Sequence, residues 1–220
     1  GIPVADLTAG LYCALGIMVA LLEREATGKG RWVHTSLLEA MVAMMDFQAT
    51  RWTMKHEVPP QAGNDHPTTV PTGLFQTSDG VVNLAGGGQQ MWDRIVAVLG
   101  IEEEAKDPDV ANDALRAKNR AKTNAMLQKV IATNTSAHWV AAFNKAGVPC
   151  GPVYAVDEIF EDPQYKSREN IKWMKDPRVG ELAIPNVVPR LTDTPGAVKW
   201  LGPSMGEHND EVYKQWLGLD

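Results

Sequence analysis

The chain has 220 residues, of which 44% are hydrophobic and 22% are charged, and its formal net charge is −6. This length suffices for one large domain or two smaller ones with a buried core, and the composition is that of a soluble globular protein. Non-specific nucleic-acid binding requires a basic face, so the acidic balance argues against it. The two cysteines, Cys13 and Cys150, form no disulfide framework, and we expect a cytoplasmic protein.

An apolar segment begins the chain. Hydrophobic residues cover most of the circumference of a helix predicted over Thr8–Ala26, and the glycines of "TGKG" follow its end, so we expect it to be packed on most sides. Its most hydrophobic part, from Leu11 to Leu22, is too short to span a bilayer, and we expect neither a signal peptide nor membrane contact. Because the chain runs from Gly1 straight into this helix, we expect that an amino-terminal portion is absent.

The sequence of residues 31–58 predicts few strands. Residues 31–38 form a short extended segment and residues 37–54 a second helix, with apolar residues at helical spacing. Prolines then interrupt regular structure from residue 59 to residue 71. If the first 58 residues belong to an α/β layer, its partner strands come from the absent portion or from another chain.

After the prolines the pattern predicts mixed α+β structure. A hairpin turns at Asp79-Gly80, and a glycine run separates it from a helix over about 91–99. Two longer helices, an extended stretch, a short helix, a second hairpin and a last helix follow, within residues 113–133, 136–146, 147–155, 156–164, 171–188 and 204–219. We therefore divide the chain into residues 1–58, a linker at 59–72, an α+β domain at 73–175 and a return segment at 176–220.

Asp6 lies one turn ahead of the first predicted helix, and the residues leave two roles open for it. As a helix cap, its carboxylate accepts hydrogen bonds from free backbone N–H groups and lies at the positive end of the helix dipole. As a nucleophile, it uses the same donors to stay ionised and oriented, while apolar surroundings exclude water.

Gly86, Gly87 and Gly88 fall between a predicted strand and a predicted helix. Such a run forms either a tight connection or a loop whose backbone approaches an anion. It is not a P-loop, because no glycine-lysine-serine/threonine follows at the required spacing. The five histidines show no metal-ligand spacing either, and we expect no metal.

Four blocks of the sequence, taken together and in this order, resemble the class III CoA-transferase family. This family includes formyl-CoA and crotonobetainyl-CoA:carnitine CoA-transferases and the related α-methylacyl-CoA racemases. The blocks cover nearly the whole chain and are specific for the family but not for a substrate. They are "ADLTAGLYCALGIMVALLEREATGKGRWVHTSLLEAMV", "GNDHPTTVPTGLFQTSDGVVNLA", "AGVPCGPVYAVDEIFEDPQ" and "PSMGEHNDEVYKQWLG".

The resemblance implies a role for each candidate residue. Asp6 is then the nucleophile that attacks an acyl-CoA thioester, forming first an aspartyl-acyl anhydride and then an aspartyl-CoA thioester, from which a carboxylic acid collects CoA. Gly86, Gly87 and Gly88 form a lid that keeps water from these intermediates, and Gln89 is a further candidate for binding the substrate. CoA thioester is a substrate, and no cofactor is bound permanently.

The resemblance also implies a fold class, α/β with α+β, in an interlocked homodimer. Residues 1–58 and 176–220 belong to a large nucleotide-fold-like α/β domain, and residues 73–175 form a smaller α+β domain. The family's amino-terminal half, which carries most CoA contacts, is absent, so we expect this chain alone to be inactive. Thr72 departs from the family pattern, which usually has an aromatic residue there.

Two other functions stay open. In a racemase, Asp6 is one of two acid/base groups that exchange an α-proton, and no covalent adduct forms. Alternatively, the chain is a non-catalytic fragment or subunit. The glycine run favours CoA transfer, because a racemase has less need to shield an anhydride from water.

Overall fold

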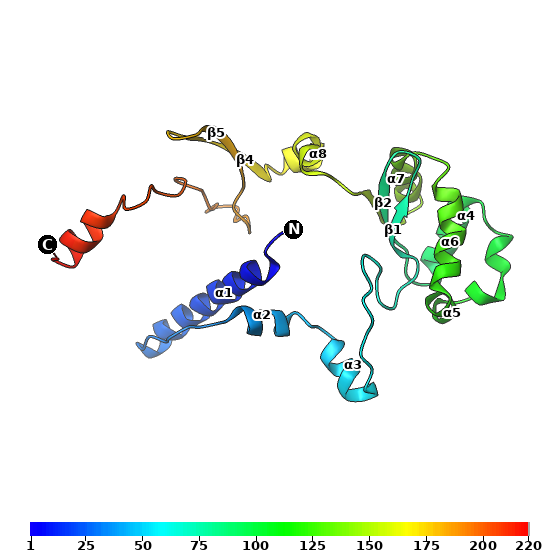
Figure 1. The fold of residues 1–220 in the computed structure, drawn as a ribbon, viewed down its shortest axis with the longest axis horizontal. Coiled ribbons are helices and arrows are strands. Elements are labelled where there is room, and N and C mark those ends of the chain that lie inside the picture. Colours follow the sequence, from blue (N-terminus) through cyan, green and yellow to red (C-terminus); the bar gives the residue numbers. More distant parts are fainter. Residues whose placement is uncertain (220) are drawn as a thin grey trace. The chain divides into compact units, whose positions relative to one another are not determined.

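The computed structural model describes residues 1–219, which divide into two compact units (Figure 1). The first unit is Gly1–Gly63, and the second begins at Asn64 and contains the rest of the described residues. The border between them lies inside the predicted linker of residues 59–72.

Helix α1 spans Val4–Thr27 and starts four residues earlier than predicted. Its first i to i−4 hydrogen bond runs from the Leu7 N–H to the Pro3 carbonyl (3.0 Å). Proline is tolerated at the start of a helix because an N–H there would have no partner within the helix. At the other end Gly28 adopts a φ of 67° and donates to the Arg24 carbonyl (2.8 Å), as the "TGKG" pattern predicts.

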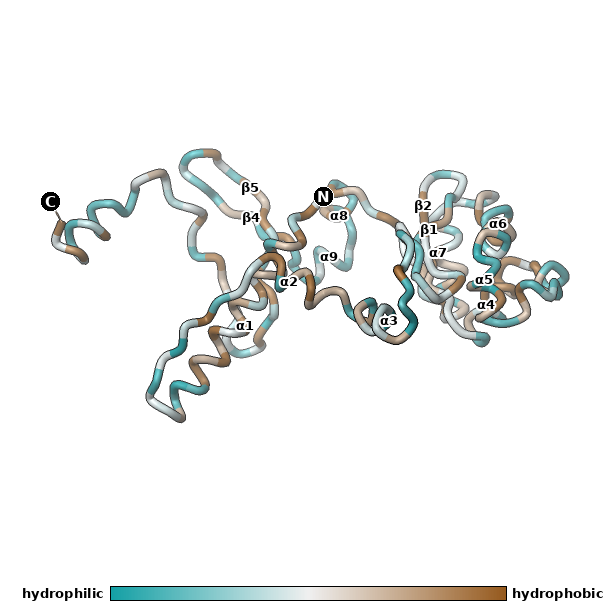
Figure 2. Tube along the Cα trace, turned by 60° about the horizontal axis from the view of Figure 1, so that its bottom comes forward, coloured by the Kyte–Doolittle hydropathy of each residue, from teal (hydrophilic) through white to brown (hydrophobic). Residues whose placement is uncertain are grey.

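The hydrophobic surface of α1 is mostly exposed within its unit, so this unit does not supply the cover that is expected for a helix packed on most sides. Only Ala9 is buried, whereas Leu11 is 72% exposed. Figure 2 shows hydrophobic residues along much of α1. Its helical neighbour in this unit, α2 (Leu37–Ala43), is too short to cover a helix of 24 residues.

The length argument against a membrane span is wrong for α1. Its 24 residues and mean hydropathy of 1.9 over the most apolar window match a segment long and apolar enough to cross a bilayer. Core helices of soluble proteins have the same length and composition, so these two properties do not assign α1 to a membrane.

The second predicted helix is two helices, α2 and α3 (Gln48–Lys55). Ser36 begins α2 by accepting from the Glu39 N–H (3.1 Å), and its hydroxyl donates to the Glu39 carboxylate (2.8 Å). Between the helices Asp46 adopts a left-handed conformation with φ of 51°, which ends regular helical geometry. The residues before Ser36 that were predicted to be extended form no strand.

The second unit contains an antiparallel sheet in the order β1-β2-β3, formed by Thr72–Gln76, Val81–Ala85 and Cys150–Pro152. The predicted hairpin is confirmed, because β1 pairs with β2 in the register Phe75 with Val82. Asp79 holds the turn: its carboxylate accepts from the Ser136 N–H (2.7 Å) and from the Thr77 hydroxyl (3.0 Å).

Four helices accompany this sheet: α4 (Gln89–Leu99), α5 (Asp113–Lys118), α6 (Arg120–Ile131) and α7 (Ser136–Lys145). Two 3₁₀ turns, η1 (Glu104–Lys106) and η2 (Pro108–Val110), link α4 to α5. The predicted helix over 113–133 is therefore interrupted at Asn119. Sheet and helices share one hydrophobic core, whose members include Phe75, Val82, Leu84, Trp92, Ile95, Leu127, Ile131, Trp139 and Phe143.

The remaining elements are α8 (Val156–Glu161), α9 (Pro163–Ser167), the hairpin of β4 (Ile171–Asp176) and β5 (Gly180–Pro185), and a π-helical segment η3 (Asp210–Trp216). The second hairpin is thus confirmed, with its turn between Asp176 and Gly180. The predicted division between residues 175 and 176 falls inside this hairpin.

Candidate active site

Asp6 is exposed and lies inside the first turn of α1, not ahead of the helix. The helix cap is Pro3, and no side chain makes a capping hydrogen bond, so the predicted capping role of Asp6 is wrong. The carboxylate still lies at the positive end of the helix dipole, which favours a negative charge there.

The glycine loop, Gly86–Gly88, joins β2 to α4, as the sequence predicted. A Cβ atom on Gly86 would stand 2.3 Å from the Ile95 Cδ1 and 3.1 Å from the Pro71 carbonyl oxygen. On Gly87 it would stand 2.3 Å from the Thr69 Cγ2, and Gly88 has a φ of 85°. A side chain at either of the first two positions requires the neighbouring Ile95 or Thr69 side chain to shift, and backbone conformation disfavours one at the third.

Not every N–H group of the glycine loop is available to a ligand. The Gly86 N–H donates to the Pro71 carbonyl (2.8 Å), and the Thr72 hydroxyl lies 3.4 Å from the same nitrogen. Helix α4 makes its first hydrogen bond from the Trp92 N–H to the Gly88 carbonyl (3.1 Å). The N–H of Gln89, in the first turn, therefore has no partner within the helix and is free to meet an anion.

The Gln89 side chain, predicted to bind substrate, is engaged within the protein at both polar atoms. Its carbonyl oxygen accepts from the Arg116 Nη2 (3.1 Å), and its amide nitrogen donates to the Asp93 carboxylate (2.7 Å). This leaves the backbone N–H of Gln89, and not its amide, as the group available to a substrate.

Arg116, which the sequence analysis did not single out, contacts the turn that follows the glycine loop. The side chain is fully buried, its guanidinium carbon lies 4.7 Å from the centre of the Trp92 ring, and it pairs with Asp113. Its Nη1 donates to the Val110 carbonyl (2.9 Å). The spacing of Asp113 and Arg116 on one helical face was visible in the sequence, but the burial of the charge was not.

A turn formed by residues 65–69 supports the glycine loop from another side. The His66 Nδ1 accepts from the Thr69 N–H (3.0 Å), and the His66 N–H donates to the Thr72 carbonyl (3.1 Å). Arg120 donates through Nη2 to the His66 carbonyl (2.7 Å). Thr69 thereby presents its methyl group to Gly87.

Thr72, where the family pattern has an aromatic residue, makes a polar contact instead. Its hydroxyl donates to the Pro71 carbonyl (2.8 Å), the group that also accepts from the Gly86 N–H. The side chain is thus part of the hydrogen bonding that holds the start of the glycine loop.

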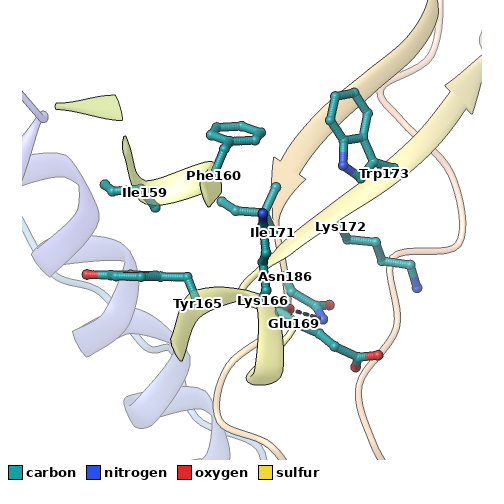
Figure 3. A pocket seen from close by; sticks show the side chains of 9 residues that line it. All are labelled: Ile159, Phe160, Tyr165, Lys166, Glu169, Ile171, Lys172, Trp173 and Asn186. Carbon is teal, nitrogen blue, oxygen red and sulfur yellow. Dashed lines mark hydrogen bonds between the residues drawn. The ribbon is translucent and has the colours of Figure 1, made fainter. Parts of the chain in front are cut away.

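A separate cavity of about 420 Å³ lies between α8, α9 and the β4–β5 hairpin (Figure 3). The Phe160 and Trp173 rings approach edge to face, with centroids 6.2 Å apart. Across the cavity Asn186 donates through Nδ2 to the Glu169 carbonyl (2.8 Å). No residue predicted to be functional lines this cavity.

The structure places the predicted residues in two groups. Asp6 belongs to the first unit, whereas Gly86, Gly87, Gly88 and Gln89 lie together in the second. Within the part of the chain that the structure describes, no group of three His, Cys, Asp or Glu residues has the geometry to hold a metal ion.

Comparison with known proteins decides the family. The sequence model of CoA-transferase family III matches residues 1–209, nearly the full chain. The chain belongs to CoA-transferase family III. This confirms the family inferred from the four sequence blocks.

Curated members of family III resemble the chain over its whole length. The chain is 31% identical to the succinyl-CoA–D-citramalate CoA-transferase of Chloroflexus aurantiacus, covering 100% of this chain and 55% of that protein. It is 27% identical to the succinyl-CoA:glutarate CoA-transferase of Mus musculus, covering 100% and 50%. The chain thus spans about half the length of these relatives.

A solved family III structure shows the same fold. A CAIB/BAIF family protein from Brucella suis is 30% identical, with a TM-score of 0.78 over 98% of this chain and 56% of that one. The mixed helix and sheet architecture of the chain is therefore that of CaiB/BaiF proteins, as the resemblance implied.

Proposed function

We propose that the protein containing this chain is a CoA-transferase that moves CoA from an acyl-CoA donor to a carboxylic acid. The supporting observation is the match to CoA-transferase family III across residues 1–209. The names of its relatives, including an acetyl-CoA:oxalate CoA-transferase of Acetobacter aceti, each specify an acyl-CoA and an acid. CoA then acts as a substrate and not as a bound cofactor.

Asp6 is the nucleophile of this proposal. Its carboxylate attacks the thioester carbonyl and expels the CoA thiolate, leaving an aspartyl-acyl anhydride. The thiolate then attacks the aspartyl carbonyl, which releases the donor acid and leaves an aspartyl-CoA thioester. The acceptor carboxylate repeats these two steps in reverse order, so Asp6 is regenerated and the acceptor leaves as its CoA thioester.

The position of Asp6 in α1 suits this chemistry. The first turn of a helix presents N–H groups without intrahelical partners, and these favour the carboxylate before attack and after its release. Asparagine at residue 6 has nearly the same size but does not form the anhydride. The Asp6→Asn variant therefore separates the chemistry from the fold.

The glycine loop supplies the second part of the proposal. The anhydride and the thioester both react with water, so the site must exclude it during turnover. The free backbone N–H of Gln89 and those of Gly87 and Gly88 are the donors that we assign to substrate carboxylates. We further propose that the protein acts in the cytoplasm as an interlocked homodimer.

Trapping with hydroxylamine tests the nucleophile. The protein expressed from its complete gene is incubated with an acyl-CoA and hydroxylamine, and mass spectrometry is expected to find a hydroxamate at Asp6. Asp6→Asn is expected to lower transfer by on the order of 10⁴-fold, as when a catalytic residue is removed. Asp46→Asn, which removes an exposed carboxylate from the same unit, is the matched control.

Two results would contradict the proposal. Near-normal turnover of Asp6→Asn would show that Asp6 is not the nucleophile. Exchange of the substrate α-proton with solvent, without an adduct on Asp6, would instead identify a racemase.

A further inference from the structure

We propose that Arg116 is a positioning residue: acting through Gln89, it holds the glycine loop in place and sets how well the loop keeps water from the acyl intermediates of the proposed reaction. The inference rests on the proposed CoA-transfer function. It concerns a side chain with no assigned role and explains why a charge is buried next to this loop.

The burial of Arg116 requires a reason beyond packing. A guanidinium removed from water is expensive to bury, and an apolar side chain would fill the same volume at lower cost. The only acidic side chain that it pairs with in the described residues, Asp113, is itself 57% exposed. The Arg116 Nε has no hydrogen-bond partner in the described residues, so the charge is not fully compensated.

The contacts of Arg116 converge on the first turn of α4. Its Nη2 reaches the Gln89 carbonyl oxygen (3.1 Å), while its guanidinium lies over the ring of Trp92, three residues further along the helix. Gln89 in turn donates to Asp93, one turn later. Arg116 therefore holds the first turn of α4, which directly follows the three glycines, through a hydrogen bond and a cation–π contact.

Gln89 is the nearest side chain able to anchor the loop from this end. The loop glycines have no side chains, and Gly88 adopts a φ of 85°, which glycine reaches without strain. A loop of this kind is held in place only through its neighbours. The hydrogen bond between Arg116 and Gln89 therefore limits which way the free N–H groups of the loop point.

A second arginine supports the turn that contacts Gly87. Arg120, four residues after Arg116, donates to the His66 carbonyl and so fixes the turn that carries Thr69. The Thr69 methyl group occupies the space where a side chain on Gly87 would stand. Because Thr69 stays in place, release of Gln89 is expected to free the loop at its α4 end only.

Loss of this anchor has a chemical consequence. When the loop moves, water reaches the acyl carbon of the anhydride or thioester. The water oxygen bonds to that carbon, a proton passes to solvent, and the carboxylate or CoA thiolate leaves. Hydrolysis of the acyl-CoA then competes with transfer to the acceptor acid.

The test compares Gln89→Met with its neighbour variant Gln90→Met, in the protein expressed from its complete gene. Both remove one exposed amide from the same turn, but only Gln89 contacts Arg116. Gln89→Met is expected to raise the ratio of acyl-CoA hydrolysis to transfer by about 10-fold or more, the effect of losing a hydrogen bond to a charged group. It should also speed amide hydrogen exchange in residues 84–91.

Arg116→Lys provides an independent variant. Lysine keeps the charge but replaces the planar fork by a single point donor, so it does not serve Val110 and Gln89 together as arginine does. It is expected to raise the same ratio, while circular dichroism confirms that the variant is folded. Gln90→Met should leave both the ratio and the exchange unchanged.

The outcomes separate this inference from the proposed function. If the wild-type protein transfers CoA and forms the Asp6 adduct, but Gln89→Met keeps the wild-type hydrolysis ratio, the positioning role is refuted. Faster exchange with an unchanged ratio also refutes it, because Arg116 would then be structural only. If the wild-type protein forms no adduct, the proposed function fails, and unchanged exchange in Gln89→Met would separately disprove the anchor.

Discussion

Replacing Gly86 by alanine tests whether packing, and not only flexibility, requires glycine in the loop. The new Cβ would stand 2.3 Å from the Ile95 Cδ1 and 3.1 Å from the Pro71 carbonyl oxygen. Ordinary carbon–carbon contacts are about 3.5–4.0 Å, so the new Cβ and the Ile95 Cδ1 must move apart by about 1 Å or more. Ile95 is fully buried in the core, so a shift of its side chain disturbs the residues packed around it.

The expected loss in the free energy of unfolding follows from this overlap. Forcing an extra methyl group into a packed core costs about 1–3 kcal/mol, and the additional contact with Pro71 places Gly86→Ala near the upper value. Ile95→Val removes the overlapping methyl group and by itself costs about 1 kcal/mol. In the double variant the new Cβ occupies the vacated space, so we expect a total loss of about 1–2 kcal/mol instead of the sum.

Urea denaturation followed by circular dichroism and tryptophan fluorescence measures these free energies of unfolding. Gly151→Ala is the matched control, since a Cβ there meets no atom within 4 Å. It should change the free energy by less than about 0.5 kcal/mol. The reasoning is refuted if Gly86→Ala is as mild as the control, or if the two single changes add within about 0.5 kcal/mol.

Three further predictions concern single side chains. Trp139→Phe removes the donor to the buried Ile131 carbonyl (2.7 Å) and should lower the free energy of unfolding by about 1–3 kcal/mol; a urea midpoint equal to wild type would contradict this. Arg178 hydrogen bonds lower the pKa of Asp176 from 3.8 to about 2, so its stabilising contribution is present above pH 4 and is lost as the pH falls through 2. The difference in melting temperature between wild type and Asp176→Asn should shrink over that range, and a constant difference would refute the link. Burial raises the pKa of the Cys150 thiol to about 11, so iodoacetamide at pH 8 should modify it far more slowly than a free cysteine, as peptide mass spectrometry would show.

Local chemistry accounts for the parts of the fold that the sequence predicted. Both hairpins, the end of α1 at Gly28 and the place of the glycine loop between strand and helix follow from turn residues and from the spacing of apolar residues. The family could also be inferred from the sequence, because four blocks in a set order are specific for it even though each block alone is a weak indication.

The errors have physical causes of their own. A helix was predicted across residues 37–54 because its apolar spacing is continuous, yet Asp46 takes a left-handed conformation that spacing does not reveal. Asp6 was placed ahead of α1 because the helix was predicted to begin at Thr8, whereas the Leu7 N–H already bonds to the Pro3 carbonyl. Helix ends depend on a few backbone hydrogen bonds, which one or two residues can shift.

The sequence by itself determined that Gly86, Gly87 and Gly88 follow a strand and precede a helix, because strand and helix patterns are local. Only the tertiary structure decided what those glycines touch and why Arg116 is buried, since Arg116 lies 27 residues from Gln89 along the chain. Contacts over such separations depend on how β2, α4 and α5 pack, and that packing follows from the shared core as a whole and not from any single segment.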